Sequence, residues 1–392
     1  MSFHFSKSKF VSSCIRCNKY AWLDKYMPEE KSPIDDFAKS LFDNGHKVGE
    51  LAKEYFNADV DVTSYKEDGR LDLAKMIKET EKHMKLGTKV IAEASFSFGG
   101  FFCSVDILLR NDDGTYNMYE VKSSKQDTKK DKKLGCVKGK YIIDAAYQQY
   151  VLKNCGVDVN KVCVVLLAED YVRNGNFELD KYFVVCDVTK HTNDRQQMIA
   201  DKLAELGTVL SNTSEPTTSF SKNCNKCDYW QFCSRNISSP SPFDVYYLDF
   251  TEKCDFNNRG ISFFAVPSNA SKLKPAALRQ IEYYNRPNDA YVDKAAITEF
   301  LDGLTYPIYS LDFETYQAVI PEYDGIATYE QVPFQFSLHV VEHPETELTD
   351  VKEAHFLDLS GADTRRAIAE SLVNNIPYGA CVMAYHGSTE RN

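Results

Sequence analysis

The stretch Phe101-Phe-Cys-Ser-Val-Asp106-Ile-Leu-Leu-Arg-Asn-Asp-Asp-Gly114-Thr-Tyr-Asn-Met-Tyr-Glu120-Val-Lys122 decides the fold of the first half of the chain. Both flanks are rich in β-branched and aromatic residues and an Asp-Gly turn signal stands between them, which predicts two antiparallel strands joined by a hairpin. Glu120 and Lys122 lie two residues apart on the second strand, so they share a face. A cross-strand neighbour such as Asp106 can meet them there.

Two carboxylates and an ammonium that converge on one face of a sheet suit the hydrolysis of phosphodiesters. Carboxylate oxygens bind hard divalent cations such as Mg²⁺ or Mn²⁺, which polarise the phosphate and lower the pKa of a bound water. A nearby ammonium positions the nucleophile or stabilises the developing charge. The alternative is an edge hairpin whose charged side chains face solvent, which is the commoner situation for an isolated Asp and Glu-x-Lys pattern.

The neighbourhood of these residues resembles the PD-(D/E)XK nucleases of the RecB type, including the iron–sulfur exonucleases of CRISPR systems. The matching residues are Asp106, the Glu120-Val-Lys122 triplet and Gln148, which stands where that family has a glutamine motif. The resemblance implies a restriction-endonuclease-like α/β core, a mixed sheet flanked by helices. It also implies that Asp106 and Glu120 bind Mg²⁺ or Mn²⁺, and that Lys122 and Gln148 complete the catalytic residues.

Two positions depart from that family. Its metal-binding histidine stands four residues after a helical glycine, but here Gly45 is followed at that spacing by Gly49, and the nearest histidine is His46. Its tyrosine four residues after the glutamine is Leu152. We therefore expect His46 or Glu93, on the preceding strand, to complete the metal centre.

Hydrophobic periodicity and turn residues give a coarse order of elements for the rest of the chain. A long helix is predicted after Ser32-Pro33, with Ser32 as its N-cap. Further helices are predicted over residues 71–86, 141–154, 194–210, 276–284 and 294–301. Strands are predicted over residues 88–98, 159–168, 182–188 and 243–250.

Length and composition set the general class of the protein. With 392 residues the chain exceeds the size at which a single core stops growing, so two domains are expected. The formal net charge of −11 argues against a generic polycation, so any contact with nucleic acid is expected to be local. The first seven residues lack the apolar core of a signal peptide, and no stretch reaches transmembrane length. We expect a cytoplasmic protein with no membrane partner.

A run of lysines follows the second strand of the hairpin. Eight lysines lie between Lys122 and Lys140, both included. Such a run is usually a solvated loop. Beside a phosphodiesterase centre it is a candidate contact for the phosphates of DNA that is single-stranded or has free ends. The candidate residues are Lys125, Lys129, Lys130, Lys132 and Lys133.

Four of the 12 cysteines form a further candidate site. Cysteines of a cytoplasmic protein are not expected to form disulfides, and Cys224, Cys227 and Cys233 have a spacing that lets their thiolates reach one metal centre with one position left open. Cys17 matches the single N-terminal cysteine of iron–sulfur RecB-like proteins, and this resemblance implies a [4Fe–4S] cluster held by the four thiolates. A structural Zn²⁺ site with the same thiolates is the alternative.

A second acidic motif lies at Leu311-Asp312-Phe-Glu314. A strand that carries Asp-x-Glu directs both carboxylates to one face, where they can share a divalent cation. A following strand from Val332 and a later apolar strand leading to Glu390 make the order similar to the DnaQ-like (DEDD) 3′-5′ exonucleases, which have an RNase H-like α/β fold. Because that family's third motif would lie beyond Asn392, we expect little independent exonuclease activity from this part.

These observations predict three parts: a PD-(D/E)XK nuclease domain with iron–sulfur cysteines over residues 1–235, a connector over 236–304, and a partial DnaQ-like exonuclease domain over 305–392. The predicted function is that of a metal-dependent DNA nuclease, with an exonuclease as the favoured type. The alternative is a catalytically weak DNA-binding or scaffold protein with protein partners in a repair or defence complex.

Overall fold

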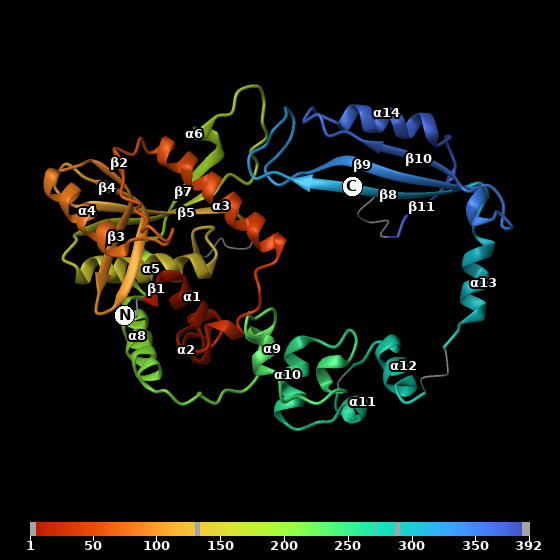
Figure 1. Cartoon of the computed structure of the whole chain (residues 1–392), viewed down its shortest axis with the longest axis horizontal. Coiled ribbons are helices and arrows are strands. Elements are labelled where there is room, and N and C mark those ends of the chain that lie inside the picture. The colour runs from red at the N-terminus through yellow and green to blue at the C-terminus, as the bar shows by residue number, and fades with distance from the viewer. Residues whose placement is uncertain (1–4, 130–133, 271, 287–290, 386–392) are drawn as a thin grey trace. The chain divides into compact units, whose positions relative to one another are not determined.

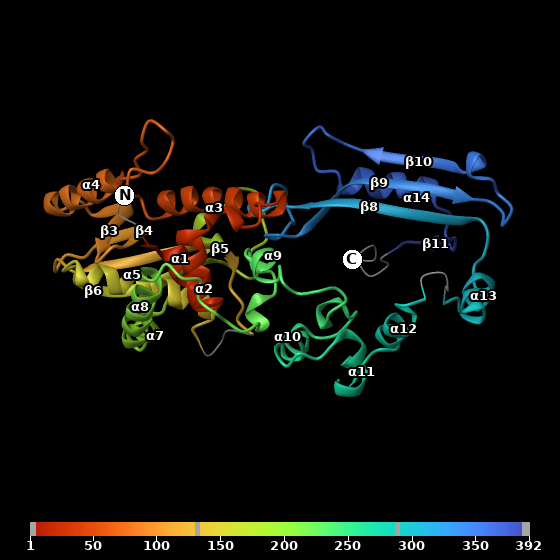
Figure 2. The ribbon, with the colours of Figure 1, turned by 60° about the horizontal axis from the view of Figure 1, so that its bottom comes forward.

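The computed structural model describes residues 5–129, 134–270, 272–286 and 291–385 (Figures 1 and 2). The chain divides into two compact units. The first comprises Met1–Glu169 and Leu179–Asp289, and the second comprises Asp170–Glu178 and Ala290–Asn392. The segment predicted to be a connector therefore lies, up to Asp289, in the first unit. Within the described ranges, no helix is both long and apolar enough to cross a membrane.

The first unit is built on a seven-stranded mixed sheet. Its strands follow the order β2-β3-β4-β5-β6-β7, and β1 pairs with β4. The pairs β3–β4, β4–β5 and β6–β7 are antiparallel, whereas β1–β4, β2–β3 and β5–β6 are parallel. The strands are β1 (Phe5–Ser6), β2 (Val60–Asp61), β3 (Val90–Phe98), β4 (Phe101–Arg110), β5 (Tyr116–Lys125), β6 (Val159–Leu167) and β7 (Phe183–Asp187).

Helices flank this sheet, which confirms the general α/β class predicted from the sequence. The α-helices of the first unit are α1 (Lys7–Ile15), α2 (Asn18–Tyr26), α3 (Asp36–Tyr55), α4 (Leu73–Leu86), α5 (Gly139–Asn154), α6 (Leu179–Tyr182), α7 (Thr189–Asn193), α8 (Gln196–Ser211), α9 (Trp230–Cys233), α10 (Phe250–Asn258), α11 (Val266–Asn269) and α12 (Pro275–Tyr283). Short 3₁₀ helices are η1 (Pro28–Glu30), η3 (Lys222–Cys224), η4 (Pro242–Asp244) and η5 (Phe263–Ala265).

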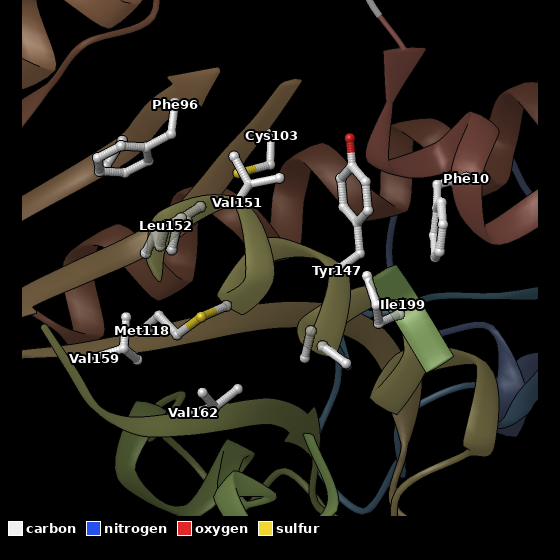
Figure 3. Close-up of a cluster of buried hydrophobic side chains, with 14 of the residues drawn as sticks. Phe10, Phe96, Cys103, Met118, Tyr147, Val151, Leu152, Val159, Val162 and Ile199 are labelled. Carbon is white, nitrogen blue, oxygen red and sulfur yellow. The ribbon is translucent and has the colours of Figure 1, made fainter. Parts of the chain in front are cut away.

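The main hydrophobic core joins α1, α5 and α8 to one face of the sheet. Figure 3 shows Tyr147, Val151 and Leu152 of α5 between strand residues and the side chains of the other two helices. All three are fully buried, and the ring of Phe10 stacks on that of Tyr147 with 4.7 Å between centroids. Each such side chain contributes roughly 1.5–3 kcal/mol through burial, so α1 and α5 are held firmly against the sheet.

The predicted hairpin is observed as β4 and β5. Their antiparallel ladder runs from Ile107 opposite Tyr119 to Arg110 opposite Tyr116. The turn between them closes at Gly114, which has a φ of +87°. Glycine adopts this conformation without a steric clash because it has no Cβ. The turn therefore fixes the register that places Ile107, in the middle of β4, opposite Tyr119 and so brings Asp106 next to Glu120.

Two local predictions from the sequence are wrong. Ser32 is not the N-cap of α3, because the side chain of Asp35 accepts the N–H of Ala38 at 2.7 Å and starts the helix three residues later. Residues 243–250 are not a strand: they lie in η4, in a bend and turn over residues 245–247, and at the start of α10, which Asp249 caps. In both cases the side chain of an aspartate accepts a helix N–H and decides where the helix starts.

The second unit contains a four-stranded sheet of order β10-β9-β8-β11. Only the β8–β11 pair is parallel in the described part of this unit. The elements are α13 (Lys294–Asp302), β8 (Ile308–Gln317), β9 (Gln331–Val341), η6 (Leu348–Asp350), β10 (Lys352–Leu357), α14 (Arg365–Asn375) and β11 (Cys381–Met383). α14 packs on the face that carries Tyr309, Phe336 and Leu338 through the buried Ile368.

A loop from the β6–α6 connection, residues 170–178, belongs to this second unit. Val172 forms an isolated bridge with Ala327. The guanidinium of Arg173 donates to the carbonyl oxygens of Pro321 and Glu322, each at 3.0 Å. The second unit is therefore assembled from two separate stretches of the chain.

Candidate active site

Five of the residues predicted to form a metal site line one pocket of about 320 Å³ in the first unit. They are His46, Glu93, Asp106, Glu120 and Lys122. Lys7, Glu50 and Lys53 also line this pocket, which we call the acidic pocket. The sixth predicted residue, Gln148, reaches it through Glu120. The predicted convergence of Asp106, Glu120 and Lys122 is therefore observed.

A local distortion of two strands turns Glu93 and Asp106 into the acidic pocket. Glu93 has a φ of +56° in the middle of β3, a left-handed conformation that costs a non-glycine residue roughly 1–3 kcal/mol. Ile91 and Ala94 pack into the same core cluster although they lie three residues apart. Regular alternation would place them on opposite faces. The distortion therefore moves one side chain on β3 out of the regular pattern, and that side chain is a carboxylate.

The paired strand is distorted at the same level. Val105 and Leu108 of β4 pack into the main core, whereas Ile107 packs on the other face of the sheet. The regular ladder between β4 and β5 stops at Ile107, and the carboxylate of Asp106 accepts the backbone N–H of Val121 at 2.6 Å. Asp106 thus takes a place that a strand carbonyl normally fills, which fixes its position beside Glu120.

Glu120 is the most enclosed acid of the pocket, with 1% of its surface exposed. Its Oε1 lies 2.6 Å from the Nζ of Lys122, and its Oε2 accepts the amide N–H of Gln148 at 2.6 Å. The same ammonium lies 2.7 Å from Oδ2 of Asp144. The side-chain amide of Gln148 donates to the other oxygen of that carboxylate, Oδ1, at 3.1 Å. Asp144 and Gln148 of α5 therefore hold the Glu120–Lys122 pair from the helix side.

Burial and charge separate the pKa values of the acids. Burial, with the neighbouring charge of Glu120, raises the pKa of Asp106 to about 7. Burial alone would also raise the pKa of Glu120, but the ammonium groups of Lys122 and Lys7 outweigh it and lower that pKa to about 2. Burial raises the pKa of Glu93 as well. Of these three acids, Glu120 therefore ionises most readily.

Sequence reasoning missed two residues of this site, Lys7 and Asp144. Asp144 lies four residues before Gln148 on α5, so the two share a helix face, and this spacing was a usable signal. Lys7 gave no signal, because a lysine at the start of a helix is ordinary. Its Nζ lies 2.9 and 3.0 Å from the two carboxylate oxygens of Glu120 and 3.5 Å from Oδ1 of Asp106.

The position of Lys7 tests whether these residues fit a divalent cation. Its ammonium lies among two carboxylates and the carbonyl oxygen of Ser104, which is 3.2 Å away. These are the hard oxygen ligands that Mg²⁺ and Mn²⁺ prefer, so the donor set suits such an ion. As the side chains stand, no group of three or more His, Cys, Asp or Glu residues in the described ranges is arranged to hold a metal ion. In the acidic pocket the ammonium of Lys7 lies among these oxygen atoms.

Only part of the predicted lysine run can be located. Lys125 is the last residue of β5, and Lys129 is exposed just beyond it. Lys130, Lys132 and Lys133 lie outside the described residues. The start of the run thus continues directly from the strand that carries Glu120 and Lys122.

The four predicted cysteine ligands come from two segments of the first unit that are far apart in the sequence. Cys17 precedes α2, and its neighbour Arg16 donates to the carbonyl oxygens of Asn223, Asn225 and Lys226 at 2.6, 2.7 and 2.8 Å. We call residues 222–233 the cysteine loop. Arg16 therefore joins the N-terminal cysteine to this loop.

The thiols of Cys17, Cys227 and Cys233 pack beside a cluster of buried aromatic residues that includes Tyr20 and Tyr229. All four predicted cysteines are free of disulfides. Burial, with smaller contributions from the thiols of Cys17 and Cys233, raises the pKa of Cys227 to about 11. The sulfur atoms therefore lie close enough to influence one another, and bound metal would supply the charge that deprotonated thiols need.

The second acidic motif lies on β8 of the second unit. Asp312 and Glu314 are exposed on one face of the strand, opposite Ser337 and Gln335 of β9, while Phe313 points to the core face. The predicted shared face is therefore observed. Glu390, predicted to be the third acid, lies outside the described residues.

Comparisons with known proteins find one family model and a weakly similar solved structure. A family model described as "Domain of unknown function (DUF2779)" matches residues 309–392, which corresponds to most of the second unit. No curated protein matches. One solved structure, described as "Crystal structure of SSO0001", is similar over 61% of this chain and 89% of its own length, with 12% sequence identity and a TM-score of 0.26. The chain is thus similar over its C-terminal part to a family of unknown function.

Proposed function

We propose that the first unit is a metal-dependent DNA nuclease with a PD-(D/E)XK core, and that it acts as an exonuclease. The observation that supports this most is the convergence of Asp106, Glu120 and Lys122 in one pocket, with Glu93 and His46 on its walls. An edge hairpin with solvated charges would leave Glu120 exposed, whereas it is 1% exposed. Burying this many charged groups costs free energy, which is common at functional sites.

In this proposal Asp106 and Glu120 hold Mg²⁺ or Mn²⁺, with Glu93 or His46 completing the site. When bound, the cation lowers the pKa of water and neutralises charge on the phosphate. The chain's own residues position the reaction. Gln148 and Asp144 fix the orientation of Glu120 and Lys122 through their hydrogen bonds.

Lys122 acts as a cation in this site. Burial alone would lower the pKa of its ammonium, but the charges of Asp144 and Glu120 outweigh burial and raise it above the ordinary value. Because the amine stays protonated at neutral pH, it cannot take a proton from water. We assign it to orienting the attacking water and stabilising negative charge on the phosphate.

We further propose that Cys17, Cys224, Cys227 and Cys233 hold a [4Fe–4S] cluster with a structural role. Support comes from the electrostatic effect of these thiols on one another's pKa and from the bonds between Arg16 and the cysteine loop. Anaerobic purification followed by absorbance spectroscopy and metal analysis tests it. Iron with sulfide and a brown colour supports the cluster, whereas a colourless protein with stoichiometric zinc contradicts it.

For the second unit we propose a partial RNase H-like fold of the DnaQ-like type. The strand order β10-β9-β8-β11, with β11 parallel to β8, supports this because such sheets have one parallel strand beside the first strand. Asp312 and Glu314 are its candidate metal ligands. We assign the cleavage to the acidic pocket of the first unit, where the acids are enclosed, because Asp312 and Glu314 are exposed.

The test compares the full chain with the variants Asp106→Asn, Asp312→Asn and Asp112→Asn on single-stranded DNA with Mn²⁺ or Mg²⁺. Asp112 is a matched control, because it is an exposed acid in the turn of the same hairpin and forms an ion pair with Lys89 at 2.7 Å, away from the pocket. We expect Asp106→Asn to lose at least about 100-fold in cleavage rate and to keep DNA binding. Asp112→Asn and Asp312→Asn should cleave at close to the wild-type rate.

Two results would contradict the proposal. Cleavage by Asp106→Asn at the wild-type rate would remove the acidic pocket as the active site. A wild-type chain that binds DNA but cleaves it with neither cation would favour the alternative of a DNA-binding scaffold in a repair or defence complex. DNA and RNA of the same sequence, tested side by side, address the choice of nucleic acid, because the 2′-hydroxyl distinguishes them.

A further inference from the structure

Lys7 is an unusual neighbour for the acidic pocket because it comes from the N-terminal helix, more than 90 residues before the acids of the hairpin. Its ammonium lies 2.9 Å from Oε1 of Glu120, and the ammonium of Lys122 lies 2.6 Å from the same oxygen. It also lies 3.5 Å from Asp106. One lysine thus bridges the two carboxylates that the proposed function assigns to the metal.

The backbone around Lys7 is held firmly, so its side chain does not enter the pocket by accident. Phe5 pairs with Phe101 of β4, and its N–H donates to the carbonyl oxygen of Gly100 at 3.0 Å. The hydroxyl of Tyr147 lies 2.9 Å from the carbonyl oxygen of Phe5. Ser6, the N-cap of α1, then starts the helix at Lys7. These contacts aim the Lys7 side chain at Glu120.

Glu120 does not need Lys7 for its own charge to be compensated. Lys122 and Gln148 already contact its two carboxylate oxygens at 2.6 Å each. Five acids lie in or beside the pocket, namely Glu50, Glu93, Asp106, Glu120 and Asp144, together with three lysines, Lys7, Lys53 and Lys122. When all are ionised their net charge is −2, which is what one divalent cation balances.

We propose that Lys7 is a further functional residue of this site: its ammonium occupies the position of the divalent cation in the metal-free protein and competes with that cation for Asp106 and Glu120. This inference rests on the proposed function. In the metal-free state the lysine keeps the two carboxylates close together. Metal binding requires the ammonium to leave, and its flexible four-carbon stem allows it to move toward the mouth of the pocket.

Lys53 provides a matched control. It lines the same pocket, but its ammonium is held by Glu50 and Asp61 at 2.7 and 2.6 Å. Replacing Lys53 therefore removes a positive charge from the wall of the pocket without vacating the position between Asp106 and Glu120. Comparing Lys7→Met with Lys53→Met therefore distinguishes the effect of vacating the position between Asp106 and Glu120 from the effect of losing one positive charge near the pocket.

The experiment measures Mn²⁺ binding to the full chain by isothermal titration calorimetry after removal of metal from the acidic pocket. We expect Lys7→Met to bind Mn²⁺ at least about tenfold more tightly than the wild type, because a competing charge a few ångströms away is gone. Lys53→Met should change the affinity by less than that. Thermal unfolding provides a second readout: without Mn²⁺ Lys7→Met should unfold at a lower temperature than wild type, and Mn²⁺ should raise its melting temperature more.

The outcomes separate this inference from the proposed function. If the wild type binds Mn²⁺ and Lys7→Met binds it equally or less tightly, Lys7 is a supporting contact and the inference is wrong while the nuclease proposal stands. If neither protein binds Mn²⁺, both are wrong. Should Lys7→Met fail to fold, Lys7→Gln, which keeps a hydrogen bond to Glu120, must show the same gain in affinity.

Discussion

Replacing Arg16 by alanine removes the guanidinium that joins the segment before Cys17 to the cysteine loop. In the wild type this group donates to three backbone carbonyl oxygens at 2.6, 2.7 and 2.8 Å. The three acceptors, Asn223, Asn225 and Lys226, lie within four residues of one another. A single side chain thus fixes the conformation of the loop that carries Cys224 and Cys227.

The expected loss in free energy of unfolding follows from how exposed these three hydrogen bonds are. A hydrogen bond from a charged donor contributes about 1.5–3 kcal/mol when buried, but exposed charged contacts contribute only about 0.2–1 kcal/mol. One of the three bonds is partly buried and two are exposed. We therefore expect Arg16→Ala to lower the free energy of unfolding by about 2–3 kcal/mol. Arg16→Lys keeps the charge but has no planar fork, and should lose about half as much.

The assay is reversible urea denaturation of the full chain, followed by circular dichroism, with metal content measured in parallel. A loss below about 0.5 kcal/mol for Arg16→Ala, within the range of ordinary surface substitutions, would show that the three bonds do not stabilise the loop. Equal stability of Arg16→Lys and wild type would show that charge matters and the planar geometry does not.

Three further predictions concern other parts of the structure. Asp106→Asn should raise the melting temperature of the metal-free protein, and this difference from wild type should grow as pH rises from about 4 to 7 and then level off. The reason is that folding raises the pKa of Asp106 to about 7, so the carboxyl destabilises the folded state increasingly above its unfolded pKa. A difference in melting temperature that does not depend on pH would contradict this. Glu93→Gly should be more stable than Glu93→Ala by about 1 kcal/mol in urea denaturation, because the φ of +56° strains alanine and not glycine. Equal stabilities of the two variants would mean that the backbone relaxes. Arg173→Ala should increase proteolysis of the second unit by removing two bonds to its 321–322 backbone, whereas the exposed Arg366→Ala serves as a control and should not.

The sequence predicted the parts of this fold that depend on local pattern. The Asp-Gly turn and the alternation on both sides gave β4 and β5, and the two-residue spacing of Glu120 and Lys122 gave their common face. The shared face of Asp312 and Glu314 followed from the same rule. These features depend only on neighbours in the sequence, so one sequence is enough to predict them.

The remaining features depend on contacts between distant segments. Nothing near Lys7 shows that its ammonium reaches Glu120, because that contact requires β1 to pair with β4. The left-handed backbone at Glu93 was equally hidden, since a glutamate in a strand normally continues it. The membership of residues 170–178 in the second unit also depends on their bonds to residues 321–327. The caps at Asp35 and Asp249 show that competition between nearby polar residues decides helix ends.

Helix α1 has a consequence for how the two candidate sites behave together. It begins with Lys7 and is followed at once by Arg16 and Cys17, and its nine residues span about 14 Å. With Phe10 packed on Tyr147, such a short helix moves as one piece. Any displacement of the cysteine loop would be carried along it to the lysine at the other end. A sample whose thiols are only partly loaded with metal should therefore contain two populations with unequal Mn²⁺ affinity.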